Sequence, residues 1–157
     1  MSKPQPADLF FCDSAREGVA RIQLLADNER QEMLAAKSCD PASRVILMTD
    51  TGKVIGEAIY DSGWQYQQQL PAELPWDSVL NLMNWSDGAT ERVEQDVKRF
   101  GAVLNEVGNI RRIHFSASEF IEIRRLGQDS LEIRAQMGDR LFQMSVEIIS
   151  ETQDAGL

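Results

Sequence analysis

Residues with catalytic chemistry are few in this sequence and lie far apart. His114 is the single histidine, and general acid–base work would require an orienting carboxylate and a nucleophile beside it. Phosphate-binding loops, dinucleotide fingerprints, nucleophile elbows and zinc-protease motifs are all missing from the sequence. We therefore predict a protein that is not an enzyme, and interpret His114 as a surface residue of a strand. An enzyme whose site lacks any recognisable motif is the least favoured alternative.

Metal ions and organic cofactors are not predicted either. The two cysteines, Cys12 and Cys39, lack the close spacing of zinc ligands or of a redox dithiol. Carboxylates alone would bind only hard cations, and weakly. We expect reduced thiols, no metal site and no cofactor.

The charge is negative overall but unevenly distributed. Sixteen Lys and Arg against 25 Asp and Glu give a net charge of −9, which disfavours nucleic acid and anionic membranes as partners. No basic residue lies between positions 53 and 92, whereas the stretch from 98 to 134 holds a basic set, namely Lys98, Arg99, Arg111, Arg112, Arg124, Arg125 and Arg134. These side chains either pair with Glu119, Glu122 and Glu132 across neighbouring strands, or part of the set faces an acidic partner and steers its association.

All three tryptophans lie in one connecting segment, 61–86. Aromatic residues dominate interface hot spots because they bury a large area with few rotamers to freeze. We therefore name Trp64, Tyr66, Trp76 and Trp85 as candidate partner-binding residues. The alternative is that they cover one end of a sheet as a small satellite core. A further candidate surface is the polar side of the helix that follows, at Arg92, Gln95 and Arg99.

The hydrophobic pattern of the first half predicts a helix and a hairpin. Apolar residues at helical spacing predict a helix that begins near residue 13 and ends before Pro41. Two apolar β-branched runs over 44–60 flank Asp50-Thr51-Gly52, which is typical of a tight hairpin in which Gly52 supplies a positive φ. A short helical stretch, 77–83, interrupts the connection that follows.

The second half predicts a long helix, three strands and a final helix. Apolar residues at a spacing of four, three, four and three predict a helix over 87–107 that buries one face, formed by Val93, Val97, Phe100, Leu104 and Val107. Alternating apolar and charged residues predict strands over 110–117, 119–125 and 130–136. A last helix is expected over 138–150.

This order of elements predicts an α+β fold. One five-stranded antiparallel sheet, in the order α-β-β-α-β-β-β-α, would be covered by helices. The length fits one domain, which we place at 13–150 with the long 61–86 connection inside it. Residues 1–12 and 151–157 are expected to be flexible tails.

The segment Ser43-Arg-Val-Ile-Leu-Met-Thr-Asp50-Thr-Gly52-Lys-Val-Ile-Gly, with the long helix and three-strand meander after it, resembles the Roadblock/dynein light chain family over about 29–150. The resemblance implies a non-enzymatic homodimer that regulates or scaffolds a Ras-like small GTPase. It also implies that the long helix and the first meander strand pair across a two-fold axis, with Val93, Val97, Phe100, Leu104 and Ile113 in the interface. Whether the dimer is homologous or mixed is left open.

A second reading is an acidic, dimeric secretion chaperone that holds an unfolded effector segment along apolar patches. Element order distinguishes the two readings, because such chaperones generally lack a hairpin followed by one long helix and a three-strand meander.

No apolar run is long enough for a membrane span, and residues 1–6 are too polar to begin a signal peptide. We therefore predict a cytoplasmic protein without membrane insertion.

Overall fold

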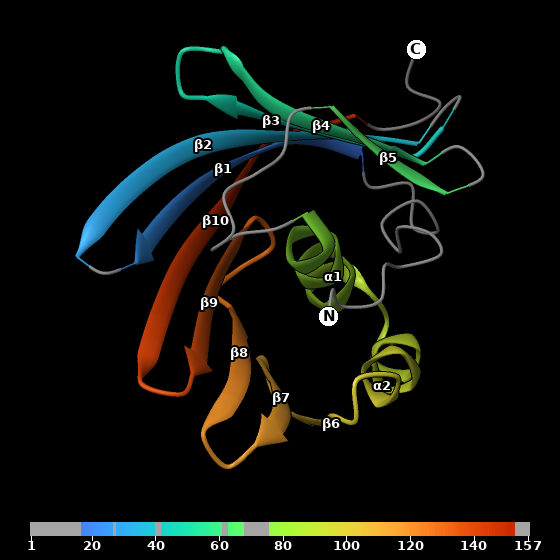
Figure 1. The fold of residues 1–157 in the computed structure, drawn as a ribbon, viewed down its shortest axis with the longest axis vertical. Coiled ribbons are helices and arrows are strands. Elements are labelled where there is room, and N and C mark those ends of the chain that lie inside the picture. Colours follow the sequence, from blue (N-terminus) through green and yellow to red (C-terminus); the bar gives the residue numbers. More distant parts are fainter. Residues whose placement is uncertain (1–16, 27, 40–41, 61–62, 68–75, 153–157) are drawn as a thin grey trace. The chain divides into compact units, whose positions relative to one another are not determined.

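The computed structural model describes residues 17–26, 28–39, 42–60, 63–67 and 76–152. Its strands are β1 (Glu17–Ala26), β2 (Glu29–Ser38), β3 (Arg44–Thr49), β4 (Val54–Tyr60), β5 (Trp64–Gln67), β6 (Val103–Val107), β7 (Ile110–Ser116), β8 (Glu119–Arg125), β9 (Ser130–Met137) and β10 (Arg140–Thr152). Two helices, α1 (Trp76–Asp87) and α2 (Thr90–Lys98), lie between β5 and β6 in the chain (Figure 1). The strands form one sheet in the order β5-β4-β3-β2-β1-β10-β9-β8-β7-β6. The predicted five-stranded α+β fold of Roadblock type is therefore wrong, because the chain is mostly β.

The predicted first helix is a pair of strands where the structure describes it. Asn28, in the turn between β1 and β2, has a φ of 65°, a left-handed conformation that asparagine tolerates in tight turns. In β2, Met33 and Ala35 are buried and their chain neighbours are not, which is the period of a strand. Glu, Arg, Gln, Leu and Ala favour helices, but this propensity is weak and cross-strand pairing overrides it. Residues 13–16 of the predicted helix lie outside the described residues.

The predicted long helix ends early, at Lys98. Gly101 has a φ of 72°, the amide of Ala102 donates to the Val97 carbonyl (3.1 Å), and the amide of Gly101 donates to the Lys98 carbonyl (3.0 Å). This is a Schellman motif, which closes a helix at a glycine in the left-handed region. The 4-3-4-3 spacing continues past Gly101, but residues 103–107 belong to β6.

The predicted last helix, 138–150, is strand β10. Gly138, with a φ of 68°, and Asp139 form the turn that pairs Met137 with Arg140. From Arg140 to Ile149 exposed residues alternate with half-buried ones after the first pair, which is the period of a strand. The strand runs through Thr152, two residues into the predicted tail, while residues 1–12 and 153–157 lie outside the described residues.

The other predicted elements are confirmed. Strands β3 and β4 form the predicted hairpin, in which Gly52 has a φ of 93°. Strands β7, β8 and β9 match the predicted meander, and α1 contains the predicted short helix. These segments share strong alternation or clear turn residues, so local sequence was sufficient to identify them.

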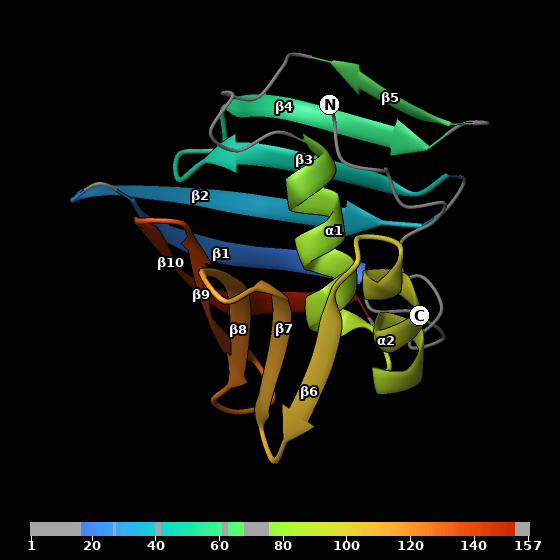
Figure 2. The ribbon, with the colours of Figure 1, turned by 60° about the horizontal axis from the view of Figure 1, so that its bottom comes forward.

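The described fold divides into two compact units. Unit 1 comprises 1–20, 33–88 and 149–157, and unit 2 comprises 21–32 and 89–148. The single domain expected over 13–150 stays a prediction. In unit 1, α1 lies on the face of the sheet that β2, β3 and β4 form, and in Figure 2 it crosses β3 and β2 (Figures 1 and 2). This face carries the buried side chains of Val45, Leu47 and Ala58, and α1 contributes the buried Leu80.

Unit 2 is built on the meander from β6 to β10. Its buried apolar residues lie two positions apart on β8 (Ile121 and Ile123) and on β9 (Leu131 and Ile133), and Ile113 is the buried residue of β7. Helix α2 packs against β6 and buries Val93 and Val97. One face of this meander is therefore a core face, and the register decides which residues occupy the other.

Candidate protein-binding face

The register of unit 2 places a set of arginines on one face of the sheet. Directly opposite residues of antiparallel strands point to the same side. One row across β6, β7, β8 and β9 is Asn105, Arg112, Glu122 and Arg134, the next is Val107, Ile110, Arg124 and Glu132, and a third begins Val103, His114 and Phe120. We call the surface formed by these eleven residues the arginine face.

The arginine face is the solvent side of the meander. Its residues alternate along the strands with the buried isoleucines and Leu131. On β6, Val103 is 61% exposed and Val107 is 79% exposed. A bound partner would remove this apolar area from water, which is favourable.

Glu122 is the exception on this face, because only 5% of it is exposed. The Arg112 guanidinium donates to Glu122 Oε1 at 2.5 Å. The same guanidinium lies 5.5 Å from the centre of the Phe120 ring. Arg112 is thus held by a carboxylate and an aromatic face, and it covers Glu122.

The surroundings of Glu122 lower the pKa of its carboxyl group from the ordinary value of 4.5. The hydrogen bond from Arg112 is the largest cause, and burial opposes it by disfavouring the charged form. The positive charges of Arg112, Arg124 and Arg134 lower the pKa further. Glu122 is therefore an ionised, buried counter-charge at the centre of the arginines.

Arg124 and Arg134 are exposed, as Arg112 is, but they differ from Arg112 in their pairing. No ion pair to either guanidinium is present among the residues that the structure describes. Glu122 acts on both through its charge but is itself shielded. The face thus offers two exposed guanidinium groups to a ligand, with Glu132 as the exposed acid opposite Arg124.

The basic set therefore divides between the two readings that the sequence left open. Arg112 pairs with Glu122 across neighbouring strands, as the first reading has it. Arg111 pairs instead with Glu106 at 3.4 Å, on the core side of the sheet. Arg124 and Arg134 are placed as the second reading requires, on one open surface.

Strand β6 is the last strand of the sheet order. Sheet edges are usually protected by proline, lysine or inward charges. The sequence of β6, Val-Leu-Asn-Glu-Val, has neither proline nor lysine. Its one charge, Glu106, accepts a hydrogen bond from the Thr90 hydroxyl (2.7 Å) and pairs with Arg111.

The predicted aromatic residues are mostly inside unit 1. Trp76 and Trp85 are each 3% exposed. Tyr66 stacks on Trp76, with ring centroids 5.8 Å apart, and Trp64 contacts Tyr60 edge-on at 5.4 Å. Trp64 and Tyr66 retain some exposed area, so a partner could reach them without unfolding α1. Their role in binding stays a prediction.

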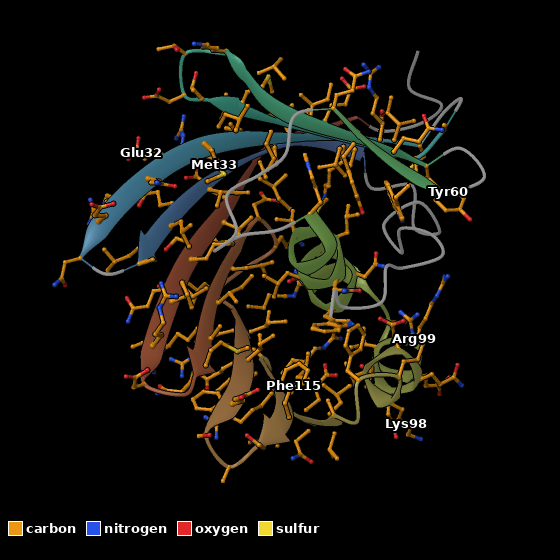
Figure 3. The ribbon with its side chains drawn as sticks, in the orientation of Figure 1. Glu32, Met33, Tyr60, Lys98, Arg99 and Phe115 are labelled. Atoms are coloured by element: carbon orange, nitrogen blue, oxygen red, sulfur yellow. The ribbon has the colours of Figure 1, made fainter. Side chains whose placement is uncertain are left out.

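The second predicted surface lies on α2. Gln95 and Arg99 are exposed and Arg92 is half-buried. Arg99 pairs with Asp96 at 2.5 Å and lies near the end of the helix beside Lys98 (Figure 3). The arginine face does not include these residues, and their role in partner binding also stays a prediction.

The predicted dimer-interface residues fall into two groups. Val93, Val97 and Ile113 are fully buried within the chain, so they have no area to offer a second copy. Phe100 lies in the turn after α2 and Leu104 lies on β6, and both are half-buried. The structure therefore does not bring the five together on one surface.

His114 lies on β7 on the same face as Arg112, as its alternation predicts, and its ring is 6.4 Å from that of Phe120. Within the described ranges, no group of three His, Cys, Asp or Glu residues is placed to hold a metal ion.

Cys39 is disulfide-bonded, which corrects the expectation of reduced thiols. The only other cysteine of the chain, Cys12, lies outside the described residues.

Sequence reasoning missed the exposed pair Val103 and Val107. The sequence analysis placed both in a helix that in fact ends before them, although the helix-breaking Gly101 and the alternation Val103, Asn105, Val107 were readable.

No protein-family model matches the sequence, and no curated protein matches it. In the part of the chain that the structure describes, neither helix has the length and apolar character needed to cross a membrane.

Proposed function

We propose that this protein is a non-catalytic interaction module whose arginine face binds an acidic segment of a partner protein. The observation that carries the proposal is the pair of exposed guanidinium groups of Arg124 and Arg134 beside the shielded Glu122. Guanidinium groups bind carboxylates with two parallel hydrogen bonds, which fixes both affinity and orientation.

A protein partner fits this surface better than a nucleic acid. The net charge of −9 opposes a phosphate backbone at long range. The valines of β6 add apolar area beside the arginines, and arginine is enriched in protein interfaces. A Ras-like GTPase was implied only by the Roadblock resemblance, and the fold found here gives that partner no support. The partner is therefore defined by its acidic chemistry.

We further propose that the module acts as a homodimer. A small sheet protein whose edge strand carries neither proline nor lysine gains by covering that edge with another chain. The expected role is that of a scaffold or regulator of its partner, and no cofactor is part of the proposal.

A charge-reversal experiment tests the proposal. Arg124→Glu with Arg134→Glu should abolish stoichiometric capture of the partner from an extract of the source cells, measured by quantitative mass spectrometry. The matched control reverses Arg30 and Lys53, which are exposed on other surfaces and change the net charge equally. Equal capture by both double variants, with unchanged circular dichroism, would contradict the proposal.

A secretion chaperone is the second candidate. The element order that disfavoured it is not the order found, since the predicted long helix and final helix are absent from the described fold. The exposed valines on edge strand β6 could hold an extended effector segment by strand addition. Binding that requires the effector to be unfolded, with no preference for acidic segments, would favour this candidate.

The disulfide of Cys39 bears on the compartment. Structural disulfides persist in oxidising compartments and are rare in the cytosol. The predicted cytoplasmic location is therefore not part of the proposal. A thiol count on protein isolated from its source under alkylating conditions tests this, because a cytosolic protein should show two free thiols.

A further inference from the structure

We infer that two copies of this chain associate by antiparallel pairing of their β6 strands around a two-fold axis at Asn105. The inference rests on the homodimeric part of the proposed function and specifies its interface. The occupant of the open edge of β6 is then a second β6, and the two meanders become one continuous sheet across the axis.

The backbone of β6 fits this pairing. Gly108 and Asn109 form a two-residue turn between Val107 and Ile110, which are directly opposite each other. Residues that flank such a turn exchange hydrogen bonds, and the bonding direction alternates along the strand. Val103, Asn105 and Val107 therefore direct their amides and carbonyls toward β7. Those of Leu104 and Glu106 point toward the open side.

An axis at Asn105 aligns these open groups. Leu104 of one copy lies opposite Glu106 of the second copy, and each such pair can exchange two hydrogen bonds, about four in total. Asn105 then faces its own equivalent as a pair without hydrogen bonds, where side chains come closest. This register uses all five residues of the strand.

The side chains are self-complementary in the same register. Val103 of one copy comes opposite Val107 of the second copy, and this contact occurs twice because of the two-fold axis. These two valines are among the most exposed large apolar residues described, at 61% and 79%. Cross-strand pairs of β-branched residues stabilise antiparallel sheets, so the pairing buries this apolar area in a favourable contact.

Helix α2 contacts β6 at Glu106, whose side chain lies on the core side of the strand. The Thr90 hydroxyl bonds Glu106, whose register partner Arg111 is opposite the buried Ile123. Val103, Asn105 and Val107 lie on the other side and remain exposed. Contacts at these three side chains therefore do not compete with α2.

The charge distribution favours association through unit 2. Unit 1 holds twelve acidic and five basic residues, whereas unit 2 holds thirteen acidic and eleven basic residues. Like charges oppose association when they are brought together. An interface built on β6 joins the nearly balanced parts of two acidic chains.

Cysteine cross-linking tests the register. Asn105→Cys in the full chain should form a covalent dimer under mild oxidation, because the two introduced thiols face each other across the axis. Gln65→Cys, exposed on the other edge strand β5, is the matched control and should cross-link much more slowly. Equal rates for the two variants would overturn the inference.

A second measurement separates this interface from the proposed function. Val103→Lys with Val107→Lys should raise the dimer dissociation constant by more than about tenfold in light scattering, with Val54→Lys as the control on another exposed valine. A dimer that survives the double change refutes β6 pairing alone. A monomeric wild type at micromolar concentration refutes the dimer as well. Partner capture lost on reversal of Arg124 and Arg134 is scored independently, so the partner-binding proposal stands or falls on its own result.

Discussion

The two edge strands of the sheet order, β5 and β6, differ in what they present to solvent. In β5 the exposed residues are Gln65 and Gln67, and Tyr66 turns inward to stack on Trp76. In β6 the exposed residues include Val103 and Val107. Glutamine satisfies its polar groups with water, whereas an exposed β-branched residue gains by burial. One edge is therefore anchored by its own unit, while the other still has apolar area to bury.

The contrast extends to how each unit is stabilised. Unit 1 relies on aromatic burial and on the disulfide of Cys39. Unit 2 combines an isoleucine core with the Arg112–Glu122 pair on its solvent face. The stability of unit 1 should therefore be sensitive to reduction, and the stability of unit 2 should be sensitive to acid.

The largest expected effect is at Trp76, which anchors β5. Trp76→Ala should cost about 3–5 kcal/mol of unfolding free energy, because the ring is buried and stacks on Tyr66. Trp64→Ala is the control and should cost clearly less, since Trp64 is only half-buried. Chemical denaturation of both variants checks this. Equal losses would show that β5 is not anchored through Trp76.

Reduction should have the next largest effect. Breaking the disulfide at Cys39 should lower the unfolding free energy by about 2–4 kcal/mol, because a cross-link restricts the unfolded chain. Thermal melting with and without a reductant measures it, and Cys39→Ser should melt like the reduced protein and ignore the reductant. A melting temperature that is the same in all three samples would contradict a stabilising disulfide.

Glu122 should make the unfolding free energy of unit 2 fall at acidic pH. Since its pKa is lower in the folded chain than in the unfolded chain, its stabilisation is complete above the unfolded pKa and disappears as the pH falls through the folded pKa. Glu122→Gln should cost about 1 kcal/mol at neutral pH, a value reduced by the exposure of Arg112, and less in acid. Denaturation at several pH values measures the difference, and a constant difference between variant and wild type would exclude this role.

The smallest effect is expected at Val107. Val107→Thr should change the unfolding free energy by at most about 0.5 kcal/mol at concentrations where the chain is monomeric, because the side chain is exposed. Val45→Thr, the same change at a fully buried position, should cost about 1–3 kcal/mol. Should Val107→Thr destabilise as much as Val45→Thr, the exposed edge of β6 would be covered by the chain itself.

Sequence reasoning worked best where the local signal was unambiguous. The β3–β4 hairpin has its turn glycine between two β-branched runs, and β7 to β9 alternate apolar and charged residues. It failed at β1, β2 and β10, whose helix-favouring residues become strands through pairing with distant segments. Three residues of the arginine face, Arg112, Arg124 and Arg134, were identified from the sequence as members of the basic set. Their common face became visible only with the register.

By itself, the sequence determined the net charge of −9, the concentration of arginines after residue 98 and the positions of the strong turns. These properties depend on composition or on residues a few positions apart, so no tertiary information is needed. Tertiary structure alone decided that Glu122 is buried among arginines, that Trp76 faces inward and that Val103 and Val107 lie on an edge. Burial and edge position depend on which strands lie next to each other, and strand order is set by contacts between residues far apart in the chain.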